Sequence, residues 1–345
     1  MSADQNERRL SLLEIEQLAY AILTDNGVSA EQADAVARNV TAAEADACRS
    51  HGVYRLLGYV KAVTTGKANG KAVPRVTQDS PAIVRVEGAR GFAPLANELG
   101  RGALIAAAQS LGIAVLAINN CYHNSAMWAD LEPLGEAGLV VIGMTPGQST
   151  VAPHGGSKPV VGTNPFAFGW PRPNQPPFVF DFATSAVARG EIELHQRAGK
   201  PIPLGWAIDA AGQPTTDPAL GLAGALLPFG GHKGTALALM IDLMAGPLIG
   251  DMTSRDALAD DGGAGCPPLG GELIIAFDPV RFMGEDVASH IASAETLLTG
   301  IGGQEGARLP GDRRLLARAQ SARDGVLVPV RLLEELAAAR LGSVA

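Results

Sequence analysis

Three side chains that can act together on a carboxylate substrate lie close to one another in the sequence SHGVYR. Ser50 and His51 are adjacent, and Arg55 follows four residues later. Histidine exchanges a proton near neutral pH, and arginine can hold a carboxylate through two parallel hydrogen bonds. The serine hydroxyl can orient the imidazole or the substrate. We expect a site for proton transfer and carboxylate binding here; the alternative is a solvated helix end.

A second polar segment, NNCYHNSAMW, follows an apolar strand. We expect Asn124 or Ser125 to cap a helix that ends at Gly138. The free N–H groups of a helix N-terminus bind phosphate, which makes this loop a candidate for cofactor contacts. An ordinary turn is the alternative, and His123 taken alone is more typical of a loop histidine.

Two further segments carry polar residues beside apolar runs. In GTNPFAFGWP, Pro165 keeps Asn164 out of the α region, so we expect Thr163 and Asn164 to be presented on an extended turn. In VFDFATSAVARGEI, Asp181 lies among apolar neighbours and needs a partner, either as a structural hydrogen-bond acceptor or as a site residue. Glu191 falls on the next helix, where a solvated carboxylate is the alternative.

The last two segments are rich in glycine and in cations. His232 and Lys233 lie in GGHKG before an apolar helix, a pattern that suits phosphate oxygens but also makes a plain loop. GARLPGDRR places Arg308, Arg313 and Arg314 around a turn. These arginines suit the extra phosphate of NADP or, without other information, a solvated surface.

The bulk composition excludes several classes of protein. The chain has 27 Lys and Arg against 35 Asp and Glu, a net charge of −8, and no cationic run, which argues against a nucleic-acid partner. Its three cysteines are far apart, so we expect no disulfide framework and no metal site. The N-terminus lacks an apolar signal segment, and the apolar runs are too short to span a membrane. We expect a cytoplasmic protein without a membrane partner.

Helices and strands expected from apolar spacing alternate along the chain, which is typical of an α/β or mixed α+β fold. The expected helices cover 11–25, 29–49, 53–63, 91–112, 185–199, 232–246, 285–301 and 330–342, and the expected buried strands cover 113–119, 139–145, 178–184 and 272–279. Ser29 and Gln32 form a capping-box pattern, and 251–271 is expected to be a loop. The GxGxxG, Walker A, HExxH and GxSxG motifs are absent, so the common nucleotide and hydrolase sites are not expected.

The order of these segments resembles the malate/L-lactate dehydrogenase family of the non-Rossmann type, over about residues 10–340. The resemblance implies a non-Rossmann NAD(P)-binding domain with a largely antiparallel sheet, beside a helix-rich domain. It also implies a homodimer with the active site near the subunit interface. We expect a helix-rich part at 1–72 that carries the Ser–His pair, a cofactor-binding sheet domain at 73–262, and a C-terminal part at 263–345 that packs back on the helix-rich domain.

The resemblance also implies roles for individual residues. His51 is the implied proton donor and Ser50 its relay partner, while Arg55 grips the substrate carboxylate and Thr163 contacts the substrate. The implied cofactor contacts are His123, Asn124, Ser125, Ala126, Met127, Asp181, Phe182, Ala183, His232, Lys233, Arg308, Leu309, Pro310 and Gly311.

At two places the sequence differs from the hydroxy-acid members of this family. There it resembles the branch that reduces Δ1-piperideine-2-carboxylate and Δ1-pyrroline-2-carboxylate to L-pipecolate and L-proline. Cys121–Asn124 replaces a loop of the Ser-His-Phe-Gly type, and Glu191 replaces a lysine. In that branch an acidic residue at the position of Glu191 completes the relay with Ser50 and His51, and an acidic partner keeps the histidine charged. We therefore expect an NADPH-dependent imino-acid reductase, with NADH as the alternative cofactor. The alternative function is an NAD(P)-dependent dehydrogenase of 2-hydroxy acids such as malate, lactate or ureidoglycolate.

Overall fold

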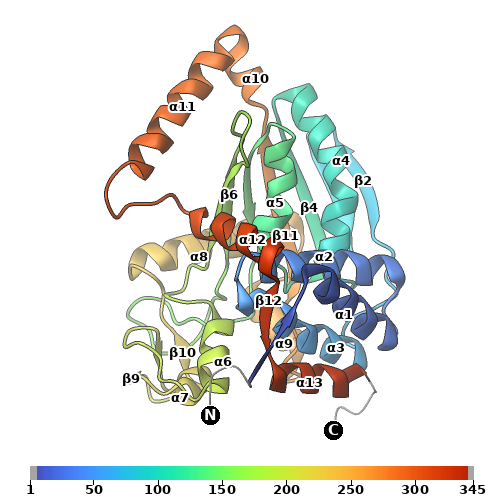
Figure 1. Cartoon of the computed structure of the whole chain (residues 1–345), viewed down its shortest axis with the longest axis vertical. Coiled ribbons are helices and arrows are strands. Elements are labelled where there is room, and N and C mark those ends of the chain that lie inside the picture. Colours follow the sequence, from blue (N-terminus) through green and yellow to red (C-terminus); the bar gives the residue numbers. More distant parts are fainter. Residues whose placement is uncertain (1–5, 341–345) are drawn as a thin grey trace.

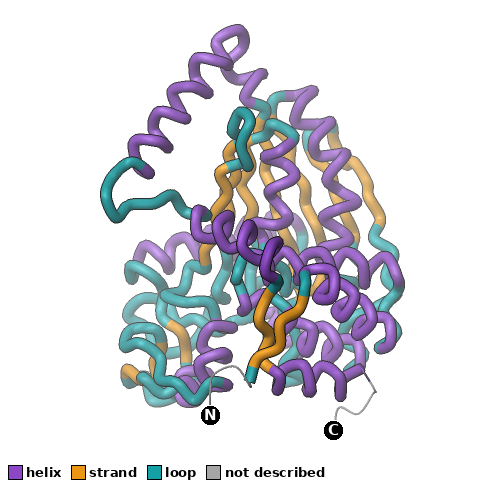
Figure 2. The backbone as a smooth tube through the Cα atoms, viewed as in Figure 1, coloured by secondary structure: helices purple, strands orange, loops and turns teal. Residues whose placement is uncertain are grey.

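A seven-stranded sheet forms the centre of the computed structural model, which describes residues 6–340 (Figures 1 and 2). The strand order is β2-β3-β4-β11-β5-β6-β7; the β3–β4 pair is parallel and the other five neighbouring pairs are antiparallel. The strands are β2 (Arg75–Ser80), β3 (Ile83–Glu87), β4 (Ile113–Tyr122), β5 (Val140–Met144), β6 (Phe166–Trp170), β7 (Phe178–Phe182) and β11 (Leu269–Phe277). The predicted mixed α/β class with a largely antiparallel sheet is confirmed.

Helices α4 (Ala93–Leu111) and α5 (Met127–Glu136) pack on one face of this sheet. Gly100 lets α4 approach β4 closely, because an added Cβ would lie 2.6 Å from the Leu116 side chain. Gly112 ends α4 in the left-handed conformation, as predicted, with a φ of 90°. Strand β4 is therefore packed tightly against α4, and its last residues reach the site described below.

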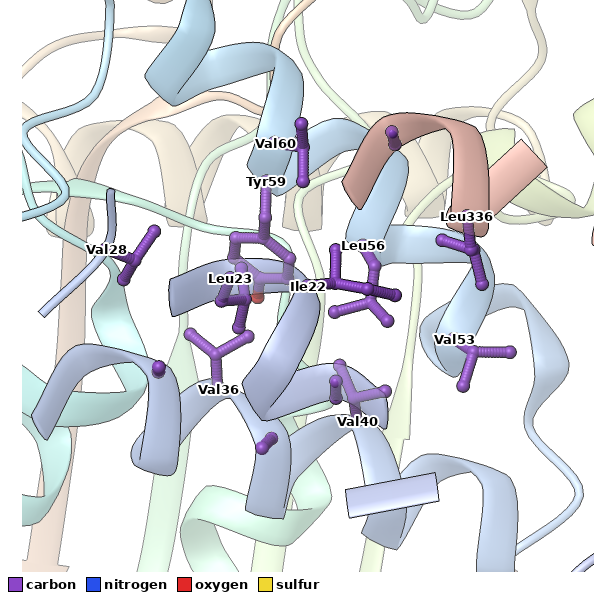
Figure 3. Packing of buried hydrophobic residues seen from close by; sticks show 14 of the residues in the cluster. Ile22, Leu23, Val28, Val36, Val40, Val53, Leu56, Tyr59, Val60 and Leu336 are labelled. Atoms are coloured by element: carbon purple, nitrogen blue, oxygen red, sulfur yellow. The ribbon is translucent and has the colours of Figure 1, made fainter. Parts of the chain in front are cut away.

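A helix-rich layer packs beside one end of the sheet and has its own apolar core. It consists of α1 (Leu12–Asp25), α2 (Ala30–Ala45), α3 (Leu56–Thr64), α13 (Val330–Arg340) and the antiparallel strand pair β1 (Glu7–Leu10) and β12 (Val326–Pro329). Figure 3 shows Ile22 and Leu23 of α1, Val36 of α2, Leu56 of α3 and Leu336 of α13 meeting in this core. Helix α13 thus packs against the first helices of the chain. The division of the chain into parts at 1–72, 73–262 and 263–345 stays a prediction.

The remaining elements surround the sheet in Figure 1. They are α6 (Arg189–Arg197), β8 (Ala207–Ile208), β9 (Pro214–Thr215), α7 (Pro218–Ala223), β10 (Ala225–Leu226), α8 (His232–Ala245), η4 (Pro247–Ile249), α9 (Ser254–Asp261), α10 (Pro279–Met283), η5 (Gly284–Asp286), α11 (Val287–Gly302) and α12 (Asp312–Asp324). In Figure 1, α10 and α11 extend away from the body of the molecule and α12 crosses back in front of the sheet.

Several predicted helix ends are wrong, each for a local reason. Helix α2 ends at Ala45 rather than near 49, and Ser29 caps it alone, because the Gln32 side chain bonds the backbone of residues 72 and 92 instead. The N-cap of α5 is Ala126, neither Asn124 nor Ser125, since the Asn39 side chain of α2 accepts the Ala126 N–H.

Residues 251–271 are not a plain loop. Thr253 forms a capping box with Asp256 and begins the helix α9. Residues 312–314, expected to lie at the GARLPGDRR turn, begin α12. The last two residues of the predicted helix 330–342 lie outside the described residues. Within residues 6–340 no single helix is long and apolar enough to cross a membrane, although the bent pair 232–249 and 254–261 meets the criteria of length and composition.

Candidate active site

A cavity of about 550 Å³ lies where the helix-rich layer meets the end of β4 and the start of α6. It brings together residues that are far apart in the sequence. The predicted site residues in its wall are His51, Arg55, His123, Asn124, Ser125, Met127 and Thr163. A concave site with an arginine and two histidines fits a small anionic ligand.

Two 3₁₀ turns hold the Ser–His–Arg group at this cavity. The first, η2 (Arg49–His51), follows α2, and the second, η3 (Val53–Arg55), leads into α3. The buried carboxylate of Glu44 accepts a hydrogen bond from the Val53 backbone N–H at 2.8 Å, and a side chain on Gly52 would collide with that carboxylate. Gly52 and Glu44 therefore fix the turn that connects His51 to Arg55.

His51 is neutral in this arrangement. Its Nδ1 lies 3.3 Å from the Ser50 hydroxyl, and its ring packs edge-on against Trp128 with 6.1 Å between ring centroids. The surrounding protein, together with the positive charge of Arg55, lowers the pKa of His51 to about 3. The expectation that an acidic partner keeps His51 charged is therefore wrong, because the charge acting on it is a guanidinium.

The Arg55 guanidinium is well oriented and still has an unused donor. Its Nη1 lies 3.7 Å from Glu193 Oε2, and the Tyr54 hydroxyl donates to the same oxygen at 3.2 Å. Its Nε is buried and has no hydrogen-bond partner within residues 6–340. Burying an N–H donor without an acceptor costs free energy. A ligand carboxylate in the cavity would supply the missing acceptor.

Glu191 does not lie in this cavity. Its side chain is 43% exposed, lies 3.8 Å from His195 Nε2, and lines a second cavity of about 460 Å³. Residues 191 and 193 are two apart on α6, so their side chains point to different sides of the helix. Glu193 is the one that contacts Arg55. The catalytic role of Glu191 stays a prediction.

A buried acid stands next to His123 in the cavity wall. Glu272 of β11 is 1% exposed, and its Oε2 lies 3.7 Å from His123 Nδ1, while His123 Nε2 lies at hydrogen-bonding distance, 3.1 Å, from the Gly270 carbonyl. Burial and the nearby Asp130 raise the pKa of Glu272 well above its usual value. Burial also lowers the pKa of His123 to about 4. Burial therefore favours the protonated, uncharged form of Glu272 and the neutral form of His123.

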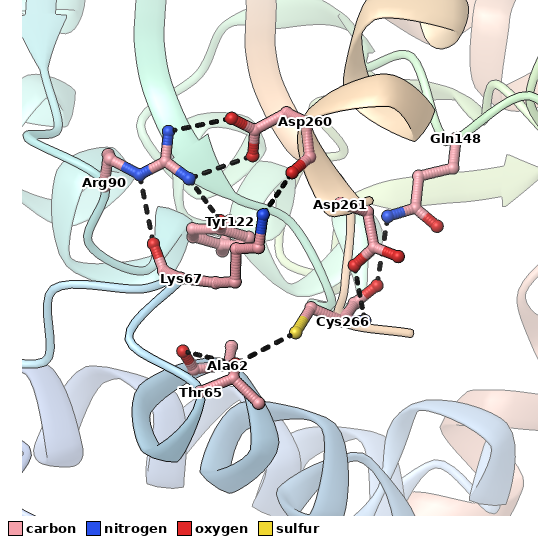
Figure 4. A network of polar contacts seen from close by, with 9 residues as sticks. All are labelled: Ala62, Thr65, Lys67, Arg90, Tyr122, Gln148, Asp260, Asp261 and Cys266. Atoms are coloured by element: carbon pink, nitrogen blue, oxygen red, sulfur yellow. Dashed lines mark hydrogen bonds and ion pairs between the residues drawn. The ribbon is translucent and has the colours of Figure 1, made fainter. Parts of the chain in front are cut away.

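Residues 261–268 form one wall of the cavity, and a polar network fixes their shape (Figure 4). Arg90 donates to both carboxylate oxygens of Asp260, at 3.2 and 2.9 Å. The neighbouring Asp261 carboxylate accepts the backbone N–H of Cys266 at 2.8 Å. Because α9 ends in these two aspartates, the segment after it is tied to the rest of the protein at its base.

The TNP turn presents Thr163 to the cavity but buries Asn164. The Asn164 backbone has a φ of 32°, so the turn is not extended as expected. Its side-chain oxygen accepts the Gly147 N–H at 2.8 Å, and its amide donates to the Ala238 carbonyl at 2.8 Å. The expectation that Asn164 is presented with Thr163 is wrong, because this side chain joins the turn to α8.

The end of β7 and the start of α8 meet beside that turn. Thr184, directly after Ala183, donates its N–H to the Thr163 carbonyl at 2.8 Å, and its own carbonyl accepts the Phe229 N–H at 3.1 Å. His232 and Lys233 open α8, whose N-cap Gly231 offers no side-chain cap. The backbone carbonyls of Gly230 and Phe229 accept the N–H groups of Lys233 and Gly234, at 3.4 and 3.0 Å. The positive end of the helix dipole and the Lys233 ammonium are the features of this end of α8 that fit the phosphates of a dinucleotide cofactor.

The Arg308–Gly311 turn leads into α12, which packs on α2 and whose Arg314 side chain donates to the Val179 carbonyl of β7. Arg308 is exposed, but Arg314 is only 13% exposed; its guanidinium lies 4.8 Å above the Trp128 ring and 4.0 Å from Asp46. Arg314 therefore holds α12 in place and is neither a free surface residue nor available to a phosphate. Burial raises the pKa of Asp181 to about 6, partly opposed by Arg314.

Comparison with known proteins adds to this geometry. The family model described as Malate/L-lactate dehydrogenase matches residues 10–337. The chain belongs to this family. This malate/L-lactate dehydrogenase family member is 56% identical over 330 residues to a Delta(1)-pyrroline-2-carboxylate reductase of Ancylobacter novellus, covering 96% of this chain and 97% of the relative. It is 53% identical to a Delta(1)-pyrroline-2-carboxylate/Delta(1)-piperideine-2-carboxylate reductase of Pseudomonas aeruginosa, covering 96% and 98%.

A solved structure of a delta1-piperideine-2-carboxylate reductase from Pseudomonas syringae pv. tomato superposes with a TM-score of 0.88 at 40% identity, covering 96% of this chain and 99% of that one. The predicted resemblance to the family and to its imino-acid-reducing branch is confirmed.

Sequence reasoning missed three residues that shape the site. Glu272 had a visible signal, since it is a lone acid in the otherwise apolar run LGGELIIAF. Glu193 had a weaker one, its position on the opposite side of α6 from Glu191. Trp128 gave no signal, because its packing against His51 depends on how α5 sits against α2.

Proposed function

We propose that this enzyme reduces a cyclic imino acid, Δ1-pyrroline-2-carboxylate or Δ1-piperideine-2-carboxylate, to L-proline or L-pipecolate with NADPH. The observation that carries the proposal is that Arg55 and a neutral His51 line the same cavity. One offers a donor to a carboxylate, and the other offers an acceptor to the N–H of a protonated ring nitrogen. A 2-keto acid has the carboxylate but no such N–H, so it would use half of the site. The names of the relatives at 56% and 53% identity support the same substrate class.

In the proposed complex, Arg55 holds the substrate carboxylate, and Thr163 contacts the substrate from the TNP turn. His51 accepts a hydrogen bond from the N–H of the protonated ring nitrogen, and the Ser50 hydroxyl is the relay partner of its imidazole. When bound, the reduced nicotinamide supplies the hydride that C2 of the ring accepts. Fixing the ring by its carboxylate and its nitrogen sets the orientation of C2, and such positioning supplies a large part of an enzyme's rate.

The proposed cofactor contacts fall into two groups. Residues 123–127 meet the nicotinamide end, because they line the cavity or, for Ala126, begin the helix beside it. Asp181–Ala183, His232, Lys233 and the Arg308–Gly311 turn take the rest of the dinucleotide. The exposed Arg308 and Arg313 are the available cations for the extra phosphate of NADPH.

We propose that the enzyme is a homodimer. In α11, Leu298 is the one buried residue of sixteen, whereas Leu297 is 65% exposed. Leu239 and Leu243 of α8 are 51% and 53% exposed. A second copy would cover these apolar side chains, which otherwise face water. Light scattering coupled to size exclusion tests this, and the mass of a single chain at micromolar concentration would reject it.

A spectrophotometric assay tests the proposed reaction. NADPH oxidation is followed with the two cyclic imino acids beside pyruvate and oxaloacetate, and again with NADH. We expect turnover with the imino acids, faster with NADPH. Turnover with the keto acids alone would instead support the 2-hydroxy-acid dehydrogenase alternative.

A further inference from the structure

The mechanism leaves open which group supplies the proton that the ring nitrogen needs. A neutral imidazole is a good acceptor, but it has no extra proton to release. The cavity contains a second candidate that the family resemblance did not assign. Glu272 lines the cavity wall, is 1% exposed, and carries an oxygen, Oε1, with no hydrogen-bond partner in the described part of the chain.

The surroundings of Glu272 favour the protonated carboxylic acid, which can give its proton to a bound ligand. Its other oxygen faces His123 Nδ1 at 3.7 Å, too far for a hydrogen bond, and His123 is already engaged with the Gly270 carbonyl. Asn97 of α4 approaches, yet both of its amide atoms lack hydrogen-bond partners. The titratable or charged groups that face this cluster are Cys121 from β4, His123 directly after β4, Asp130 from α5, Arg101 from α4 and Asp251 from the segment before α9.

We propose that Glu272 is a catalytic residue that protonates the imine nitrogen and then accepts the resulting N–H through its carboxylate. His51 accepts the second N–H, which the ring nitrogen carries once the reduced ring has taken up a proton from solvent as a protonated amine. This inference rests on the proposed function, since a keto acid offers no basic nitrogen. The O–H bond of Glu272 breaks and an N–H bond to the ring forms. The hydride that C2 accepts then forms the new C–H bond, and the π electron pair of the C=N bond moves to nitrogen as its lone pair, leaving a C–N single bond. The carboxylate regains its proton from solvent after the product leaves.

The chemistry explains why an acid is buried here. An empty cavity has no positive charge at this position, so the neutral acid is stable; a bound iminium supplies that charge and stabilises the carboxylate at the moment it forms. A keto acid brings an oxygen acceptor instead and gains no such charge pair. Glu272 therefore also selects the imine over the ketone.

The first test uses Glu272→Gln, which keeps the shape of the side chain but has no acid proton. We expect kcat/KM for Δ1-pyrroline-2-carboxylate at pH 8 to fall about 100-fold, in the range of general acid catalysis. The defect shrinks as the pH falls, because the imine then arrives already protonated. Glu136→Gln on the exposed end of α5 is the matched control and keeps the wild-type rate. A defect of equal size at every pH, or no defect, would overturn the proposal.

The second test measures binding without turnover. Pyrrole-2-carboxylate carries a ring N–H, whereas furan-2-carboxylate has a ring oxygen of similar size and no donor. One net hydrogen bond predicts that the wild-type protein binds the pyrrole about 5- to 10-fold more tightly. Glu272→Met removes the acceptor, and the ratio then falls toward one. A ratio that stays at the wild-type value would contradict the contact.

The two proposals fail in different ways. If the wild-type enzyme does not reduce cyclic imino acids, the proposed function is wrong. If it does, while Glu272→Gln behaves like Glu136→Gln, only the role of Glu272 is wrong. Quenching of tryptophan fluorescence by NADPH and the thermal midpoint show whether each variant is folded.

Discussion

Gly190 at the start of α6 gives the sharpest test of the carboxylate clamp, because it leaves room for Arg55. An added Cβ would sit more than an ångström inside the closest ordinary contact with Arg55 Nη2, and 3.1 Å from Cζ. It would also touch the Ser50 carbonyl oxygen at 3.4 Å, an ordinary contact distance. Gly190→Ala must therefore push the guanidinium away from its present position by about 1 Å, and displacements of that size reduce rates strongly.

The size of the effect follows from the hydrogen bonds at stake. Losing one of two charged hydrogen bonds to the substrate carboxylate costs about 1.5–3 kcal/mol, or about 10- to 150-fold. We expect that loss mainly as a higher KM for the imino acid, with the affinity for NADPH unchanged. The assay is steady-state NADPH oxidation at 340 nm over a series of substrate concentrations.

A matched control separates this effect from a general change in helix stability. Gly102 of α4 is also helical, and a Cβ there meets nothing within 4 Å. Gly102→Ala is expected to raise the unfolding free energy by up to about 1 kcal/mol and to leave KM unchanged. If Gly190→Ala shows the same KM as Gly102→Ala, Arg55 is not the clamp.

Three further predictions concern single side chains. His51→Ala should lower kcat by about 100-fold or more with little change in the Kd of NADPH, and an unchanged kcat would remove His51 from the mechanism. Glu193→Gln should raise KM because it frees Arg55, whereas a larger loss of kcat in Glu191→Gln would assign the acidic relay position to Glu191. Burial raises the pKa of Asp181 from 3.8 to about 6, so between these values the folded protein keeps a proton that the unfolded chain has lost, and stability falls as pH rises. Urea unfolding across pH 4 to 7 should show a weaker decline for Asp181→Asn, and an identical decline would contradict this assignment.

The parts of the site that the sequence predicts best are local in the chain. Ser50, His51 and Arg55 lie on two consecutive turns, so their grouping needs little tertiary information. The β4–α5 loop is similar, since a strand end and a helix start position it directly. Four of the seven sheet strands (β4, β5, β7 and β11) and most helices also follow from apolar spacing, because burial sets that spacing, whereas β6 lies in a segment expected only as a turn.

What the sequence could not predict depends on packing between distant elements. Arg314 belongs by pattern to a surface turn, yet α12 folds it over Trp128. The predicted charge of His51 was wrong because the pKa of its imidazole depends on desolvation and on the guanidinium of Arg55. Neither effect can be read from the sequence alone. Glu272 reaches the cavity because β11 pairs with β4 and the register of that pair shifts between Gly270 and Glu272.

Transfer of deuterium tests the central claim most directly. NADPH doubly deuterated at C4 of the nicotinamide is incubated with Δ1-pyrroline-2-carboxylate, and the product is analysed by mass spectrometry and chiral chromatography. The proposed reaction predicts L-proline with one deuterium at its α-carbon. Absence of proline, or proline without deuterium, would contradict hydride transfer to C2 of a cyclic imine in this cavity.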